Sequence, residues 1–271
     1  MQYDPIKRSL GSIFNRNPFL RKVFYRLLDL LLLRAWHVHK ELRRWEKGKP
    51  NNLNVLDAGA GFGQYTYFLS RLNKNWNIRA VDVKEEQVED CNSFFSQIGM
   101  AEKVKFSVAD LTTFKSDTHF DLVLSVDVME HILEDVLVFK NLIACMNPGA
   151  MLVISTPSDQ GGSDVHSQDD ASFIEEHVRD GYNINEIEEK LKSAGFSKVE
   201  ARYSYGAPGK ISWRLSMKYP IQFLGAVPRF IGFLLLPFYY LIAYPISFVL
   251  NMADVRIKHK SGTGLIVKAY K

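Results

Sequence analysis

The chain has 271 residues, of which 46% are apolar and 24% charged, with a formal net charge of +4. This length and composition favour one large domain with additions and are ample for a buried core. The two cysteines, Cys91 and Cys145, fall far apart in expected helices without metal-ligand spacing. We therefore exclude a zinc site and expect the reduced thiols of a cytosolic protein.

The charge is distributed unevenly along the chain. Residues 1–50 carry a net charge of +8, residues 51–197 a net charge of −13 and residues 198–271 a net charge of +9. Basic ends on both sides of an acidic centre predict an anionic surface as partner of the ends. Nucleic acid and anionic lipid are the two candidates.

Residues 1–50 predict an N-terminal basic amphipathic helical segment. No secretory signal is evident, and residues 1–18 resemble an irregular lead-in. From Phe19 to Trp45 apolar residues recur at helical spacing, with lysines and arginines between them. Such a helix can lie on an anionic membrane surface or pack as a cap on a sheet, and the two roles are compatible.

The stretch Leu53–Gln64 combines an apolar run, the acid Asp57 and glycines at positions 59, 61 and 63. This order predicts a buried strand, a tight turn and a helix start, as in the first unit of a nucleotide-binding fold. The dinucleotide fingerprint fails because Gln64 stands where its third glycine belongs. A ligand with a cationic amino group and no phosphate would suit Asp57. The alternative is a strand-to-helix turn without a ligand.

Three further strand-like runs follow in order, each with polar residues at or after its end. Asp82 closes the run 78–82, where an acid suits hydrogen bonds to ribose hydroxyls. The run 104–108 leads to Asp110, and the run 120–125 is followed by Val-Asp-Val-Met-Glu-His at 126–131.

Together these motifs resemble class I S-adenosylmethionine-dependent methyltransferases over roughly residues 51–196 and a last strand. The string at 126–131 is similar to that of the methyltransferases of ubiquinone and menaquinone biosynthesis and their small-molecule relatives. The resemblance implies an α/β, Rossmann-like sheet with helices on both faces and S-adenosylmethionine as cofactor. It implies cofactor contacts at Asp57, Ala58, Gly59, Gly61, Gly63, Gln64, Asp82, Val83, Asp110, Leu111, Ser125 and Val126.

The remaining elements follow from periodicity and turn residues. Helices are expected at 62–72, 85–98, 132–146 and 184–194, and further strands at 151–155, 198–205 and 264–270, with a turn at Asn147-Pro148-Gly149. The loop 156–183 is expected to be a solvated lid at the acceptor edge. Alternatively, its residues Asp164, His166, Asp169 and Asp170 could bind a metal, although we assign no metal site.

A hydrophobic helical insert is predicted before the last strand. Residues 230–250 carry no charge over 21 positions, a length that could cross a bilayer. Because the strands on either side must pair in one sheet, the chain must cross an even number of times or not at all. With Pro237 and Pro245 expected to break the run, we predict a bent hairpin in one leaflet or a segment lying at the interface. A buried lid over the substrate pocket is the alternative.

These patterns divide the chain into an N-terminal segment (1–50), a methyltransferase domain (51–206 and 258–271) and an insert (207–257). The predicted function is methylation of a lipophilic lipid, quinone or phenol acceptor by a cytoplasmic protein, peripheral or monotopic at the inner face of the membrane. His131 would be the general base for a hydroxyl acceptor, or it could cap the following helix; His166 and His177 are weaker alternatives. A nucleic-acid methyltransferase is disfavoured because no Asn-Pro-Pro-Tyr motif follows the fourth strand. An inactive membrane adaptor that binds the cofactor is the third alternative.

Overall fold

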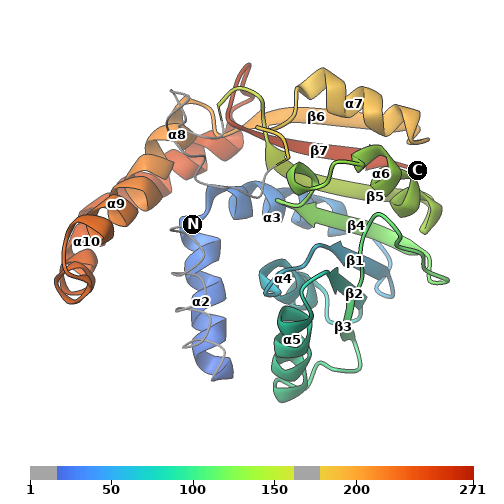
Figure 1. The fold of residues 1–271 in the computed structure, drawn as a ribbon, viewed down its shortest axis with the longest axis horizontal. Helices are drawn as coiled ribbons and strands as arrows, with labels where there is room; N and C mark the ends of the chain where they lie inside the picture. Colours follow the sequence, from blue (N-terminus) through green and yellow to red (C-terminus); the bar gives the residue numbers. More distant parts are fainter. Residues whose placement is uncertain (1–16, 162–177) are drawn as a thin grey trace.

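The computed structural model describes residues 17–161 and 178–271, with one mixed sheet at its centre (Figure 1). The strands are β1 (Asn54–Ala58), β2 (Asn77–Asp82), β3 (Val104–Val108), β4 (Phe120–Val126), β5 (Met146–Pro157), β6 (Lys198–Ser204) and β7 (Gly264–Tyr270). The helices are α2 (Pro18–Leu31), α3 (Leu33–Glu46), α4 (Gln64–Leu72), α5 (Glu85–Gln97), α6 (Asp135–Ala144), α7 (Ile184–Ser193), α8 (Ala207–Trp213), α9 (Tyr219–Ala226) and α10 (Arg229–Arg256). A 3-10 turn, η1 (Met129–His131), and a π-helical segment, η2 (Arg214–Lys218), complete the described elements.

The strand order is β3-β2-β1-β4-β5-β7-β6, with β7 antiparallel to both of its neighbours. Strands β1 to β5 are parallel, and therefore their carboxyl ends meet at one edge of the sheet. The strand order changes direction between β1 and β4, which is where open α/β sheets bind ligands. The predicted α/β fold class with helices on both faces is confirmed.

Two apolar cores lie on the two faces of the sheet. On β1, Val55 faces a core that includes residues of α3, α4 and α5, whereas Leu56 faces a core that includes residues of α6 and α7. This alternation buries both faces and explains why the parallel strands are nearly continuous apolar runs. Cys91 and Cys145 are both buried and free, as expected.

The expected single N-terminal helix is wrong, because the chain forms two helices that meet at Leu32. Leu32 has extended backbone angles (φ −87°, ψ 110°) and is buried. The break lets α2 lie beside α5 and the glycine turn after β1, while α3 lies against the sheet (Figure 1). The helical spacing of the apolar residues does not indicate this change of direction, because α2 and α3 each bury one apolar stripe.

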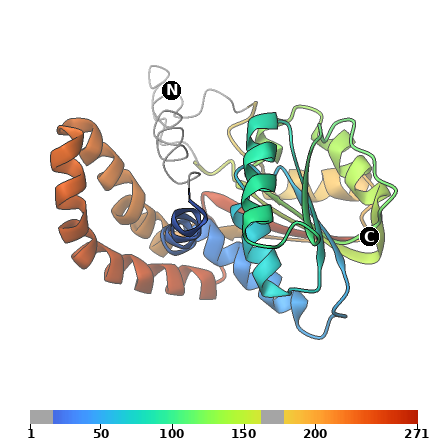
Figure 2. The same cartoon turned by 90° about the horizontal axis from the view of Figure 1, so that it is seen from below.

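Two further expectations need correction. Asn147-Pro148-Gly149 is not a separate turn but lies within β5, and the helix expected at 132–146 is the shorter α6, which begins at Asp135 and ends at Ala144. Pro237 and Pro245 do not interrupt α10, which is one helix of 28 residues. Figure 2 shows that α10 is bent along its length, which is how a helix accommodates internal proline.

The insert forms a helical hairpin between β6 and β7. One arm consists of α8, η2 and α9, and the returning arm is α10. Figures 1 and 2 both show this hairpin projecting away from the sheet. Because both ends of the hairpin return to neighbouring strands, the insert leaves the pairing of β6 with β7 intact.

Candidate active site

The glycine turn after β1 is held in an unusual conformation. Gly59, Gly61 and Gly63 have φ values of 84°, 52° and 83°, in the left-handed region that side chains rarely adopt. A Cβ atom on Gly59 would lie 2.3 Å from Cγ2 of Val128, whereas one on Gly61 would meet only Gln87 Oε1 at 3.8 Å. The turn is therefore packed against the segment after β4 but open above Gly61, where a ligand can approach the backbone.

Asp82 ties the end of β2 to this turn. Its Oδ2 accepts a hydrogen bond from the Gly61 amide at 2.8 Å, and its Oδ1 accepts one from the Lys84 amide at 3.0 Å. An ionised carboxylate has about four acceptor positions, so Asp82 retains acceptor capacity for hydroxyl groups of a ligand. The adjacent Val83 is 62% exposed and adds an apolar surface next to the carboxylate.

Asp57 lies at the end of β1 and is 2% exposed. Its Oδ2 accepts a hydrogen bond from the Thr66 hydroxyl at 2.5 Å. Burial is the main cause that raises the pKa of Asp57 to about 7; the Thr66 hydrogen bond opposes this shift and the nearby Asp82 charge adds to it. A cationic group brought to this place would favour the ionised carboxylate.

The other predicted cofactor residues occupy the same edge in different environments. Asp110 is exposed and accepts hydrogen bonds from the Thr112 amide and hydroxyl, which lower its pKa. Leu111 is buried in the core, as is Ala58. The fully buried Ser125 has a hydroxyl without a hydrogen-bond partner in the described part of the chain, and the neighbouring Val126 is half-buried.

Gln64, another predicted cofactor residue, is bonded to the N-terminal helix α2. Its side chain is 4% exposed, and its amide donates a hydrogen bond to Asp29 of α2 at 2.8 Å. Burial raises the pKa of Asp29 to about 6, against the effect of this hydrogen bond. The side chain of Gln64 therefore contacts α2, and its predicted contact with the cofactor stays a prediction.

The turn after β4 carries the candidate base. His131 is half-buried at the end of η1, and the preceding Glu130 is almost fully buried and accepts a hydrogen bond from Thr156 of β5 at 3.0 Å. Burial raises the pKa of Glu130. Asp127 has a φ of 52°, rare for a residue with a side chain, and forms an ion pair with Arg34. Backbone strain of this kind clusters at functional sites.

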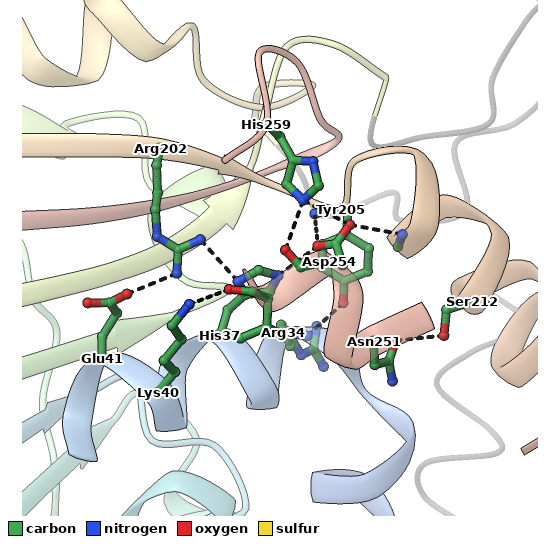
Figure 3. Close-up of polar contacts among 12 residues, drawn as sticks. Arg34, His37, Lys40, Glu41, Arg202, Tyr205, Ser212, Asn251, Asp254 and His259 are labelled. Carbon is green, nitrogen blue, oxygen red and sulfur yellow. Dashed lines mark hydrogen bonds and ion pairs between the residues drawn. The ribbon is translucent and has the colours of Figure 1, made fainter. Parts of the chain in front are cut away.

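A buried carboxylate joins the hairpin to the domain at this edge (Figure 3). Asp254 of α10 is fully buried and accepts hydrogen bonds from His37 Nε2 at 2.9 Å, the Gly209 amide at 2.9 Å and the Tyr205 amide at 3.2 Å. Its Oδ2 also lies 3.1 Å from Nε2 of His259. Burial alone would raise the pKa of Asp254, but the hydrogen bond from His37 and the other partners bring it below its usual range.

We call this group the Asp254 junction, and it reaches the candidate site through Tyr205. The Tyr205 hydroxyl accepts a hydrogen bond from the Arg34 amide at 2.9 Å, and the Arg34 side chain pairs with Asp127. On the other side, Arg202 of β6 lies 3.1 Å from His37 Nδ1 and 3.0 Å from Glu41 (Figure 3). The base of the hairpin, α3 and the turn after β4 thus form one connected polar structure.

Sequence reasoning missed this structure. The sequence patterns assign no separate role to Asp127, Arg34 or Asp254. No local signal could have paired them, since Arg34 and Asp127 are 93 positions apart and His37 and Asp254 are 217 apart.

The loop between β5 and α7 is only partly described. The candidate metal ligands Asp164, His166, Asp169 and Asp170, together with His177, lie outside the described residues. Beyond them, the Val178 amide donates to the Glu130 carbonyl, and Arg179 pairs with Asp135. Among the residues that the structure describes, no group of three or more histidine, cysteine, aspartate or glutamate side chains is arranged to hold a metal ion.

Comparison with known proteins agrees with this geometry. The family model described as a methyltransferase domain matches residues 49–201. Phosphoethanolamine N-methyltransferase of Triticum aestivum is 29% identical over 156 residues, which cover 56% of this chain and 29% of that protein. Ubiquinone biosynthesis O-methyltransferase of Rickettsia felis is 29% identical over 107 residues, 39% of this chain and 42% of that protein.

Solved structures show the same fold. Phosphoethanolamine N-methyltransferase 2 of Haemonchus contortus, solved in complex with S-adenosyl-L-methionine, superposes with a TM-score of 0.62 at 18% identity, over 88% of this chain and 53% of that one. The chain spans less than half of the length of the curated relatives given above. The matched region contains the glycine turn, Asp82, Asp110 and the turn after β4. The chain therefore belongs to the methyltransferase-domain family, as the predicted class I, S-adenosylmethionine-dependent type.

Proposed function

We propose that this protein transfers the methyl group of S-adenosylmethionine to a lipophilic small molecule at the surface of a membrane. The observation that carries the membrane part of the proposal is the hairpin, whose large apolar side chains point outward. Six of those on α10 are between 58% and 79% exposed, namely Phe230, Leu234, Phe238, Leu241, Ile242 and Val249. Within the described residues, α10 contains one segment, Leu234–Arg256, that is long and apolar enough to cross a membrane.

The contact between the two arms of the hairpin is built from small and polar residues. The buried positions on the first arm are Gly209, Ser212, Ser216 and Pro220, and those facing them on α10 are Ala243, Ser247, Asn251 and Asp254. Ser212 donates a hydrogen bond to Asn251 at 2.6 Å, and Tyr239 and Tyr240 donate to carbonyls of η2 at 2.7 Å. Small residues and hydrogen bonds between helices, with large apolar residues outside, are typical of helices packed in lipid.

A soluble hairpin would place its large apolar side chains between the arms, because full burial of each contributes about 1.5–3 kcal/mol. In this hairpin the large apolar side chains lie on the outside, so that the free energy of burying them is gained only when a partner covers the outer surface. We favour this over a buried lid, because only 17% of the apolar stretch within Leu234–Arg256 is buried. Two arms that enter and leave on the same side also satisfy the requirement that β6 and β7 pair in one sheet.

The N-terminal helix supports an anionic membrane. Phe19, Leu27 and Leu30 of α2 are between 42% and 69% exposed, and Lys22 and Arg26 lie on the same helix. Apolar side chains next to cations suit a surface of anionic lipids. These features support our proposal that the protein lies at the cytoplasmic face of a membrane, with α2 as a peripheral contact and the hairpin as the inserted element.

The domain's own residues fit the cofactor. The open side of Gly61 leaves room for a ligand near the backbone, Asp82 retains acceptor capacity for ribose hydroxyls, and the buried Asp57 gains from a cationic amino group. Asp110 and the buried Leu111 then provide the adenine contacts, and Ser125 and Val126 the wall beside them. Bound there, the cofactor supplies an electrophilic methyl group on a sulfonium centre. The protein's task is to align the acceptor with it and to exclude water.

The chemistry of the acceptor decides whether a base is required. Of the relatives given above, one is by its name an N-methyltransferase of phosphoethanolamine and the other an O-methyltransferase of ubiquinone biosynthesis. For a hydroxyl acceptor, we propose His131 as the residue that takes the proton, because it lies in the turn after β4 beside the strained Asp127. For an amine acceptor that arrives unprotonated, His131 would be dispensable.

The test combines labelling with a hairpin variant. Purified protein is incubated with methyl-labelled S-adenosylmethionine and a cell lysate, and label is compared in organic, nucleic-acid and protein fractions. We expect label in the organic fraction that disappears with Asp82→Ala. Label in nucleic acid would favour the alternative that uses the basic ends for RNA or DNA. Cofactor binding without any labelled product would favour an inactive adaptor.

Membrane binding is measured separately with vesicles of phosphatidylcholine and phosphatidylglycerol. Replacing both Leu241 and Ile242 by Glu removes two outward apolar side chains, and the lost burial alone predicts about 100-fold weaker partitioning. The matched control is Leu137→Glu on α6, which is 45% exposed on the body of the domain. Equal partitioning of the hairpin variant and the parent protein would refute insertion of the hairpin.

A further inference from the structure

Arg21 of α2 is a buried cation that the chemistry described above does not use. Its side chain is 3% exposed, although it lies on a helix that the sequence presents as a basic surface segment. Its guanidinium donates from Nε to the Tyr25 hydroxyl at 2.7 Å, from Nη1 to the Asp90 carbonyl at 3.1 Å and from Nη2 to the Phe62 carbonyl at 2.9 Å. Nη2 also lies 3.0 Å from Sγ of Cys91.

Tyr25 acts on the same carbonyl. Its fully buried side chain donates from the hydroxyl to the Phe62 carbonyl at 2.5 Å, so that this one oxygen accepts hydrogen bonds from both side chains. The rings of Tyr25 and Phe62 are stacked at 6.2 Å, and the Arg21 guanidinium lies 4.8 Å from the centre of the Phe94 ring. The pair is therefore fixed on several sides.

Phe62 lies between Gly61 and Gly63, at the centre of the proposed cofactor turn. Cys91 contacts the preceding carbonyl, with Sγ 3.7 Å from the Gly61 oxygen, and burial raises the pKa of this thiol to about 12. On the opposite side of the turn, Asp82 holds the Gly61 amide. The carbonyls of the turn are thus held by α2 and α5, and the amide of Gly61 by β2.

We propose that Arg21 and Tyr25 are positioning residues that hold the glycine turn in its cofactor-binding conformation. Three left-handed glycines in five residues lose much conformational entropy when they are ordered. If the turn were mobile, the cofactor would bear this cost on binding, whereas a turn already held by α2 avoids it. Neither residue needs to touch the cofactor, because both act through the Phe62 carbonyl.

This arrangement also gives α2 a function of its own. Its inner side carries Arg21 and Tyr25, and its exposed side carries Phe19, Leu27 and Leu30. The helix that borders the cofactor turn is therefore the one whose outer side we assign to the membrane. The part of the inference that concerns cofactor affinity rests on the proposed function, and the part that concerns the turn does not.

The experiment compares Tyr25→Phe with Tyr67→Phe in the full chain. Tyr25→Phe keeps the ring but removes the hydroxyl, and with it the hydrogen bond to the Phe62 carbonyl and the one from Arg21 Nε. Loss of the hydrogen bond to the turn predicts about fivefold weaker binding of S-adenosylmethionine in calorimetry. We expect the KM for the cofactor to rise while kcat at saturation stays unchanged. Tyr67→Phe is the control, because its ring belongs to the same aromatic cluster, 5.3 Å from that of Tyr25, and lies under Arg71.

Amide hydrogen exchange of the cofactor-free protein provides the second readout. The proposal predicts faster exchange at residues 59–64 in Tyr25→Phe and in Arg21→Met, with Arg21→Lys in between, because lysine can donate to the Phe62 carbonyl alone. Unchanged affinity and unchanged exchange in Tyr25→Phe would overturn it, as would equal effects of Tyr67→Phe. If the parent protein fails to bind S-adenosylmethionine, the proposed function fails, and the exchange comparison still decides whether α2 holds the turn.

Discussion

Replacing Asp57 by Asn should stabilise the cofactor-free protein and weaken cofactor binding. Asp57 is 2% exposed, and its carboxylate accepts a hydrogen bond from the Thr66 hydroxyl. Burial raises its pKa from 3.8 to about 7. Since one pKa unit corresponds to about 1.4 kcal/mol, the fold favours the neutral carboxyl by roughly 4 kcal/mol. Asn has nearly the same shape, can still accept from Thr66 and never ionises.

The sign of the effect follows from proton linkage. Below about pH 4, Asp57 is protonated in both the folded and the unfolded protein, and its ionisation costs nothing. Between about pH 4 and pH 7 the unfolded chain releases the proton while the folded protein keeps it. The free energy of unfolding then falls by up to about 1.4 kcal/mol per pH unit, and above pH 7 the cost is constant. The advantage of Asp57→Asn should therefore grow from pH 4 to pH 7 and then level off.

Denaturant unfolding without cofactor at acidic, neutral and mildly basic pH measures this difference. A matched control is Asp121→Asn, because Asp121 is another strand aspartate whose carboxylate accepts hydrogen bonds, from the Asn54 amide and the Asn147 side chain, but which is only half-buried on β4. A difference between Asp57→Asn and the parent that does not change with pH would refute the reasoning. Calorimetry tests the expected loss of cofactor affinity. Unchanged affinity of Asp57→Asn for S-adenosylmethionine would show that Asp57 is not part of the cofactor site.

Three further predictions concern Asp82, the Asp254 junction and His39, a buried residue of α3 that stacks on Phe68. Asp82→Ala should sharply weaken cofactor binding in calorimetry, because the carboxylate is proposed to bind ribose and also holds the Gly61 amide; unchanged affinity would contradict the assignment. Asp254→Ala should lower the free energy of unfolding by about 3–5 kcal/mol, because it leaves buried donors of His37, Tyr205 and Gly209 unsatisfied; a loss below about 1 kcal/mol in denaturant unfolding would speak against a structural junction. Burial lowers the pKa of His39 to about 3, so its contribution to stability is present above pH 6.5 and falls by about 2 kcal/mol at pH 5. His39→Gln should remove this acid dependence in the same assay, and an unchanged pH profile would show that His39 does not cause it.

Much of the fold could be predicted because each strand carries its own local signal. The last strand was placed at Gly264–Tyr270, and the ends of β1, β2 and β4 were located by the polar residues that follow apolar runs. Parallel strands buried on both faces leave no other place for such residues than the carboxyl edge. For the same reason the candidate cofactor residues could be proposed from their order in the chain alone.

What could not be predicted depends on contacts between distant segments. The division of the N-terminal helix at Leu32 follows from two different surfaces that α2 and α3 must reach, and nothing in the local apolar spacing differs on the two sides of the break. The burial of Arg21 is a similar case, since a guanidinium on an amphipathic helix ordinarily faces water. Its four partners come from two other places in the chain, the glycine turn and α5, and from the next turn of its own helix.

The Asp254 junction connects the hairpin, which is the proposed membrane element, to the turn after β4, although the sheet topology does not require such a connection. A hairpin inserted between two paired strands could be joined loosely, because β6 and β7 pair without it. Instead, the end of α10 is fixed by a buried carboxylate whose donors come from α3, from the end of β6 and from the start of α8. Tyr205, one of these donors, also accepts from the amide of Arg34, whose side chain holds Asp127. The base of the hairpin is therefore connected through Tyr205 and Arg34 to Asp127 in the turn after β4, where the candidate base His131 also lies.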